Sequence, residues 1–167
     1  MGQVLFVNFR EMPVIGTCNL GSCSVAVIAS QYGAILAHIS PLPPTASGVW
    51  ADPYAGDNNA RRMMDRVHEL YILHRDFFQA SNTRTYVVSA WYNGAVALPY
   101  QLAIIQDRFR QMQLEPSRHK YVVPGNRAMD GQGTVLVASP PELSWQPSVY
   151  VEDELVNGPI PWAVLPR

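Results

Sequence analysis

The residues of this chain that could carry out nucleophilic chemistry gather in one short stretch, "GTCNLGSC", at residues 16–23. Both cysteines of the chain, Cys18 and Cys23, lie in it, just before the apolar run "SVAVIAS". Cysteine acts as a nucleophile or as a metal ligand in its thiolate form. The two residues could therefore form a disulfide, contribute to a metal site, fill space in the core, or include a nucleophile.

The bulk properties of the chain argue against two of these roles. The start "MGQVLFVNFREMP" lacks the basic and long apolar segments of a secretory signal, and no apolar run approaches the roughly 20 residues that span a bilayer. We therefore expect a soluble cytoplasmic protein without membrane association, with reduced thiols rather than a disulfide. A structural zinc site usually takes about four ligands. The chain has no second cysteine pair, so we expect no metal, and nothing indicates a cofactor.

Composition alone favours small buried hydrophobic roles for both cysteines, but two features favour Cys23 as a nucleophile. Cys23 follows Gly21 and Ser22, where a glycine turn meets a strand, and such turns leave backbone N–H groups that can hold an oxyanion. His38 lies in the neighbouring apolar run "GAILAHIS", where its ring needs a polar partner. That partner is either the backbone or a nucleophile for which His38 acts as base. Cys18 is given no role.

The elements around these residues predict a single α+β domain over residues 1–167, with a mixed β-sheet and two main helices. The expected elements, in chain order, are a strand within 3–10, a hairpin of 23–30 and 33–40, a proline-rich loop 41–56, a helix from Asp57 (as N-cap) to Gln79, a strand 84–92, a helix 99–112, and a second hairpin of 119–124 and 133–139 turning at Asp130-Gly131. A proline-rich extension, 140–167, follows as an irregular wrap or a pair of short edge strands. Net charge is −1 and charged residues are 15%, so no strong field attracts nucleic acid.

The hairpin register decides whether the cysteine and the histidine can meet. With the turn at Gln31-Tyr32, Ala26 faces Ala37, and Cys23 falls close to residues 39–41. A strand stagger of one or two residues brings His38 within reach of Cys23.

The pattern T-x-x-L-G-S-C-x-V-A-V, followed by G-x-x-x-A-H, resembles the CheD family of bacterial chemoreceptor glutamine deamidases, which share a Cys-His-Thr site with cytotoxic-necrotizing-factor-type deamidases. The resemblance is specific over residues 17–38 and looser over 3–139. It implies a layered sandwich fold, with Cys23 as the nucleophile, His38 as the catalytic histidine and Thr17 as the residue that orients the histidine.

The resemblance extends to "PGNRAMDGQGTVLV", which is similar to the glycine- and asparagine-containing stretch that precedes the last strand in that family. It places Asn126, with Gly21 and Ser22, among the residues that contact substrate or oxyanion. The loop 41–56 and the extension 140–167 are not recognised features of the family.

These residues predict a cysteine-dependent amidohydrolase that deamidates glutamine side chains through a thioester. In that reaction His38 takes the proton of Cys23, and the resulting imidazolium pairs with the thiolate. The expected partner is a protein with an exposed glutamine, or a small amide or ester. Two alternatives stay open: a Cys-His acyl-transfer or cyclisation enzyme that acts on a small molecule, and a catalytically inactive binding module.

Overall fold

The computed structural model describes residues 2–43, 52–125, 131–140 and 146–157. Its elements, in chain order, are β1 (Val4–Asn8), β2 (Val14–Thr17), β3 (Ser24–Ala29), β4 (Gly33–Ile39), α1 (Ala55–Leu73), a short 3-10 helix η1 (Arg75–Phe77), β5 (Arg84–Tyr92), β6 (Ala95–Val96), α2 (Pro99–Gln111), β7 (Ser117–Val122), β8 (Val135–Ala138), β9 (Ser148–Val151) and β10 (Glu154–Leu155).

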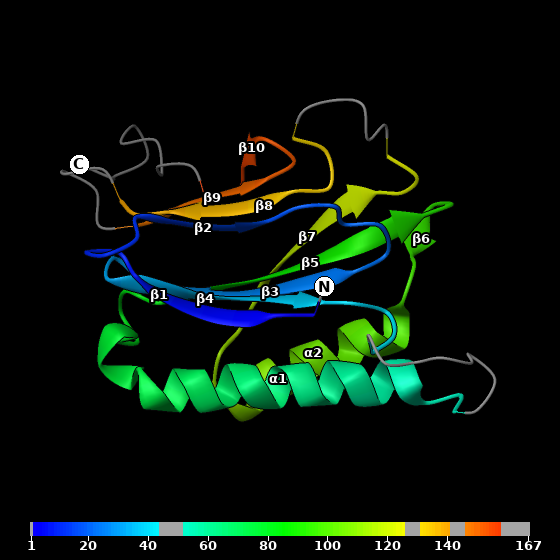
Figure 1. Cartoon of the computed structure of the whole chain (residues 1–167), viewed down its shortest axis with the longest axis horizontal. Coiled ribbons are helices and arrows are strands. Elements are labelled where there is room, and N and C mark those ends of the chain that lie inside the picture. Colours follow the sequence, from blue (N-terminus) through cyan, green and yellow to red (C-terminus); the bar gives the residue numbers. More distant parts are fainter. Residues whose placement is uncertain (1, 44–51, 126–130, 141–145, 158–167) are drawn as a thin grey trace, which may run out of the picture.

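Three layers make up the described part of the molecule (Figure 1). The middle layer is a six-stranded sheet in the order β1-β4-β3-β5-β6, with β7 paired to β5. A four-stranded sheet in the order β10-β9-β8-β2 covers one face, and α1 and α2 cover the other. Because the pairing of β5 with β7 is parallel and the other pairings are antiparallel, the large sheet is mixed. The expected class, α+β with a mixed sheet and two main helices, is confirmed.

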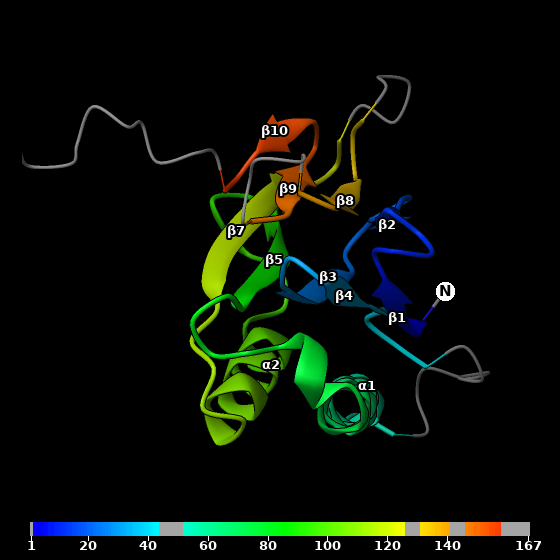
Figure 2. The ribbon, with the colours of Figure 1, turned by 90° about the vertical axis from the view of Figure 1, so that its left-hand side faces the viewer.

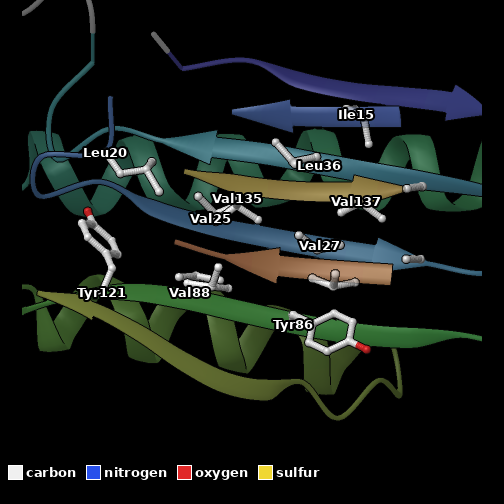
Figure 3. Close-up of a cluster of buried hydrophobic side chains, with 14 of the residues drawn as sticks. Ile15, Leu20, Val25, Val27, Leu36, Tyr86, Val88, Tyr121, Val135 and Val137 are labelled. Atoms are coloured by element: carbon white, nitrogen blue, oxygen red, sulfur yellow. The ribbon is translucent and has the colours of Figure 1, made fainter. Parts of the chain in front are cut away.

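The β3–β4 hairpin forms the centre of the large sheet and has the register expected from the sequence. Ala26 pairs with Ala37, and both strands are buried along their whole length. The continuous apolar character of these strands follows from their position, since one face packs on the helices and the other on the second sheet. Figure 3 shows the residues that fill the space between the two sheets.

The helical layer begins and ends differently from the expectation. Helix α1 starts at Ala55, after Tyr54, so Asp57 lies in its first turn rather than at the N-cap position. It ends at Leu73, and η1 follows as a separate short turn. The expected buried stripe is present, with Met64 and Val67 almost wholly buried. Helix α2 begins with Pro99 in its first turn, as expected, because proline lacks the N–H that the first turn leaves unpaired.

The second expected hairpin is wrong. Strand β7 pairs in parallel with β5 in the large sheet, whereas β8 pairs with β2 and β9 in the small sheet. The local turn signal at Gly131, which has a φ of +80°, is present, but the two strands separate into different layers. Strand β2 was not expected, because four residues are too few for a clear alternation. Within the extension, β9 and β10 form a pair of short strands, as one of the two expectations had it, but only β10 is an edge strand, because β9 pairs with both β8 and β10.

No helix in the part of the chain that the structure describes combines the length and the apolar character needed to cross a bilayer.

Candidate active site

Thr17 and His38 come from different sheets and meet between them. Thr17 is the last residue of β2 in the small sheet, and His38 is the last but one of β4 in the large sheet. The Thr17 hydroxyl oxygen, Oγ1, lies 2.7 Å from Nδ1 of His38, within hydrogen-bond distance. This contact is consistent with the orienting role that the resemblance implies for Thr17.

Strand pairing on both sides holds the backbone of His38. It pairs with Val25 of β3, and its N–H donates to the carbonyl of Gln3 at 2.9 Å. The residue is only 7% exposed, and no described residue forms a hydrogen bond with its second ring nitrogen, Nε2. Burial lowers the pKa of His38 from its ordinary value of 6.5, because the charged imidazolium loses its hydration. The structure therefore favours the neutral ring at neutral pH.

Cys23 lies immediately before β3 and is 5% exposed. It stands two residues before Val25, the cross-strand partner of His38, so both side chains are on the face of the large sheet that packs against the small sheet. Diagonal neighbours of this kind have α-carbons roughly 7–8 Å apart and side chains closer than that. The backbone carbonyl of Cys23 accepts a hydrogen bond of 2.6 Å from the Tyr121 hydroxyl, which fixes the backbone at this residue.

The loop before Cys23 is fixed against the small sheet. The N–H of Leu20 donates to the carbonyl of Gly133 at 3.0 Å. The two backbones approach so closely that a β-carbon at Gly133 would lie 2.9 Å from the Leu20 carbonyl oxygen. Asn19 turns the chain in a left-handed conformation, with φ of 59°. Among the described residues, none accepts a hydrogen bond from the backbone N–H of Gly21 or Ser22.

A cavity of about 690 Å³ opens against this loop. Gly21 and Ser22 lie in one wall, and Tyr121, Gln132 and Glu152 lie in the others. Neither Cys23 nor His38 belongs to the lining, so the cavity reaches the backbone just before the thiol while the thiol itself lies deeper, between the sheets.

The structure thus joins Thr17 and His38 by a hydrogen bond and places Cys23 on the same face of the large sheet, just before the strand that pairs with β4. No hydrogen bond joins the thiol to Nε2 of His38. Gly21 and Ser22 line the cavity next to Cys23. Asn126, which was expected at the same site, lies outside the described residues. Cys18 is exposed and forms no disulfide with Cys23. Within the described ranges, no group of three or more histidine, cysteine or acidic side chains is arranged to hold a metal ion.

Three residues that contact Cys23 or line the cavity were not predicted from the sequence. Tyr121 appeared only as one apolar position of a strand, and no local pattern links it to a cysteine 98 positions away. Gln132 and Glu152 belong to segments whose sheet partners were assigned wrongly or left open. The glycine at 133, next to the turn, was the one visible signal that two backbones approach each other there.

No protein-family model matches the chain, and a search of curated proteins finds no match either. The fold and the site define an α+β domain of three layers, with a part-buried hydrogen bond between a threonine and a histidine near a buried cysteine.

Proposed function

We propose that this protein is a cysteine-dependent amidohydrolase that converts glutamine side chains to glutamate, as its sequence resemblance to CheD-like deamidases implies. The observation that supports this most is the 2.7 Å contact between Thr17 Oγ1 and His38 Nδ1. When Nδ1 carries the proton and donates it to Thr17, the lone pair of Nε2 is available to act as base. His38 suits the role of a base because Thr17 holds Nδ1, whereas Nε2 has no hydrogen-bond partner among the described residues.

The first half of the reaction forms a thioester. His38 Nε2 removes the proton of Cys23 as its sulfur attacks the carboxamide carbon of the substrate, so charge separation arises during attack and not before it. This refines the ion pair expected from the sequence, because burial lowers the pKa of His38 and disfavours a resting imidazolium. The carbon–nitrogen bond then breaks, and ammonia leaves with the proton that His38 returns.

The second half consumes one water molecule. His38 removes a proton from water, the hydroxide attacks the thioester, and the thiol is regenerated as the carboxylic acid leaves. The net change is carboxamide plus water to carboxylate plus ammonium. Each half passes through an oxyanion, for which the backbone N–H groups at Gly21 and Ser22 are candidate donors, because they lie at the cavity wall without a described acceptor.

A second candidate function has its own support. The cavity of about 690 Å³ falls within the range of roughly 300–1,000 Å³ that is typical of small-molecule sites. The same residues would then hydrolyse or transfer the acyl group of a small amide or ester. The two candidates differ in substrate size and not in mechanism.

The first experiment tests activation of the thiol and needs no substrate. The protein is treated with limiting iodoacetamide, and the label is assigned to Cys18 or Cys23 by peptide mass spectrometry. Accessibility alone favours Cys18, which is exposed, over Cys23, which is buried. We expect Cys23 to react faster in the wild type and to lose this advantage in His38→Ala. Preferential labelling of Cys18 in both proteins would count against an activated nucleophile.

The second experiment measures ammonia release and glutamine-to-glutamate conversion in an unfolded casein and, separately, in free glutamine. Cys23→Ala should abolish release, and Cys18→Ser is the matched control that should retain it. Turnover of casein alone supports protein deamidation, and turnover of free glutamine alone supports the small-molecule candidate. No turnover of either, with Cys23 unreactive, would overturn both.

A further inference from the structure

One charged side chain lines the cavity beside the cysteine loop. Glu152 lies in the tight turn between β9 and β10, in the small sheet. Of the described residues that line the cavity of about 690 Å³, Glu152 is the only charged one. Gly21 and Ser22, which directly precede Cys23, line the same cavity. The cavity at the cysteine loop therefore has one negative charge in the described part of its wall.

Hydrogen bonds hold the Glu152 carboxylate close to the cysteine loop. Its Oε1 atom accepts a hydrogen bond of 3.0 Å from the N–H of Gly133. The carbonyl of Gly133 accepts a hydrogen bond of 3.0 Å from the N–H of Leu20. A single residue, Gly133, thus connects the carboxylate to the backbone that leads to Cys23. The N–H of Glu152 also donates to the carbonyl of Thr134 at 3.1 Å. Both the backbone and the charge of Glu152 therefore have a defined place at the cavity.

The Glu152 carboxylate has no cationic partner among the described residues. It is partly buried, and none of the described ion pairs includes it. Gln132 lines the same cavity, and its carbonyl oxygen, Oε1, is buried without a hydrogen-bond partner in the described part of the chain. A buried acceptor without a donor is unfavourable. The cavity thus offers one charged and one neutral acceptor oxygen to a ligand that brings donors.

The same two residues mark the boundary between two cavities. Glu152 and Gln132 also line a second cavity of about 890 Å³, so the two cavities adjoin there. Figure 2 shows β9 and β10 above β5 and β7, on the side of the molecule away from β1. A substrate whose reactive amide lies at Gly21 and Ser22 can therefore extend past Glu152 into the larger cavity.

The basic residues that line the larger cavity do not pair with Glu152. Arg118 and Lys120 alternate along β7 with Tyr121, which packs between the sheets, so they face the helical layer. His119 faces the same side as Tyr121, but burial lowers the pKa of His119 from 6.5, so its ring is neutral at neutral pH. The negative charge of Glu152 is therefore available to a ligand.

We propose that Glu152 determines substrate specificity by selecting glutamine substrates that carry a positive charge, a lysine ammonium or an arginine guanidinium, close to the reactive carboxamide. This rests on the deamidase function proposed above and names its substrate class. The carboxamide lies at the end of the cavity formed by Gly21 and Ser22, and the cation lies at Glu152 and Gln132. Ammonium and guanidinium groups carry several N–H donors, so one cation can bind both acceptor oxygens. The same carboxylate disfavours an acidic neighbour.

The test compares capped pentapeptides with one glutamine and, at each position from two before it to two after it, lysine, norleucine or glutamate. Norleucine has the stem of lysine without the ammonium. Ammonia release gives kcat and KM for each peptide. At one position at least, lysine should raise kcat/KM about two- to fivefold over norleucine, the size of a partly exposed ion pair. The gain should lie in KM, because the cation does not contact the reacting atoms, and it should shrink with added salt.

Two variants with the same substitution assign the effect to one carboxylate. Glu152→Gln removes the charge and keeps an oxygen that can accept from Gly133, so the contact to the cysteine loop is preserved. It should abolish the preference for lysine over norleucine, which is a ratio within one variant and is independent of its overall rate. Glu154→Gln changes an exposed residue of the same hairpin that lies outside the smaller cavity, and it should keep the wild-type preference.

A second readout needs no turnover. Cys23 and Cys18 are modified with a cationic trimethylammonium-ethyl and an anionic sulfonatoethyl methanethiosulfonate, and each site is quantified by peptide mass spectrometry. Cys23 should favour the cationic reagent more than the exposed Cys18 does, and Glu152→Gln should remove that excess.

Turnover without preference for lysine, with the same ratio of the two reagents at Cys23 in the wild type and Glu152→Gln, would overturn the role of Glu152 and leave the deamidase standing. Loss of the preference in Glu154→Gln as well would assign it to general charge and would also overturn that role. Absence of turnover with every peptide, casein and free glutamine, together with an unreactive Cys23, would overturn both proposals.

Discussion

At the scale of single residues, the proposed active site has a hydroxyl group in the position where many cysteine and serine hydrolases have a carboxylate. Thr17 is neutral, so it orients the ring of His38 without stabilising an imidazolium by charge. Burial acts in the same direction, since it lowers the pKa of His38. Such a histidine is suited to moving a proton during the reaction and is poorly suited to holding a permanent ion pair.

Replacing Thr17 by valine tests the orienting role. Valine has nearly the same shape and lacks the hydroxyl, so His38 loses its partner at Nδ1 while packing between the sheets is kept. We expect kcat for ammonia release to fall by about 10²-fold, as for other groups that position an acid or base. Thr17→Ser, which keeps the hydroxyl, should retain most of the rate. A valine variant with the wild-type rate would show that the ring is oriented by its packing alone.

The pH dependence of Cys23 reactivity follows from the pKa of His38. In the proposed mechanism His38 acts as a base in its neutral form. Burial lowers the pKa of His38 below the ordinary value of about 6.5. The ring therefore stays neutral as the pH falls from 8 to 6.5. We therefore expect the acid limb of the iodoacetamide rate to have its midpoint below 6.5. The rate is measured for Cys23 by peptide mass spectrometry across the acid range. A midpoint at or above that value would mean that burial does not lower the pKa of His38, or that the thiol of Cys23 ionises without help from the histidine.

At the scale of elements, the sequence predicts best where periodicity is long and contacts are local. The run 84–92 was expected as a strand and is β5 without adjustment. The β3–β4 register followed from a two-residue turn and the fully apolar strands. The same local reasoning failed for β7 and β8, because a turn signal at Gly131 says only that the chain turns there. Which sheet each strand then joins depends on partners far away in the sequence.

The candidate site was predictable to the same limited extent. Cys23 directly precedes β3 and His38 lies on β4 of the same hairpin, so the expected register placed them near each other, to within a stagger of one or two residues. Thr17 could be assigned only through the resemblance, because its strand joins the other sheet and its approach to His38 is a contact between layers. The contact of Tyr121 with Cys23 depends on the parallel pairing of β7 with β5, which no turn or periodicity in the chain indicates.

The variant Tyr121→Phe tests how far strand β7 supports Cys23, the proposed nucleophile. Tyr121→Phe keeps the buried ring and removes the hydroxyl that donates to the Cys23 carbonyl at 2.6 Å. An unsatisfied buried carbonyl costs about 1–3 kcal/mol, so we expect urea unfolding to show a loss of this size. We also expect slower labelling of Cys23, because its backbone is less well fixed. Unchanged labelling with reduced stability would restrict Tyr121 to a structural role.

At the scale of the whole molecule, each of the three layers makes a separate contribution to the proposed active site. The helices bury one face of the large sheet and give β3 and β4 a rigid support. The small sheet covers the other face and contributes Thr17 and the Gly133 contact to Leu20. Because Cys23, His38 and Thr17 lie between the two sheets, the proposed active site exists only when both layers are in place. Any change that separates the sheets should therefore reduce activity before the helices unfold.

A buried histidine, His38, and a partly buried one, His119, make the stability of the whole fold depend on pH in a defined direction. Burial lowers the pKa of both His38 and His119 from 6.5 in the folded protein. Below that pH the unfolded chain binds protons on these side chains that the folded protein does not bind. The free energy of unfolding must therefore fall as the pH drops below 6.5, until the pH passes the lowered folded pKa values.

The slope of this loss can reach about 1.4 kcal/mol per pH unit for each histidine. Urea unfolding curves measured at steps between neutral pH and the lower limit of solubility give the slope directly. In the double variant His38→Gln, His119→Gln the part of the slope that begins just below 6.5 should disappear, whatever the stability of the variant at neutral pH. Each single variant should remove a share of it. If the double variant keeps the wild-type slope in this range, burial does not hold these two rings neutral, and the acid limb expected for Cys23 labelling loses its basis as well.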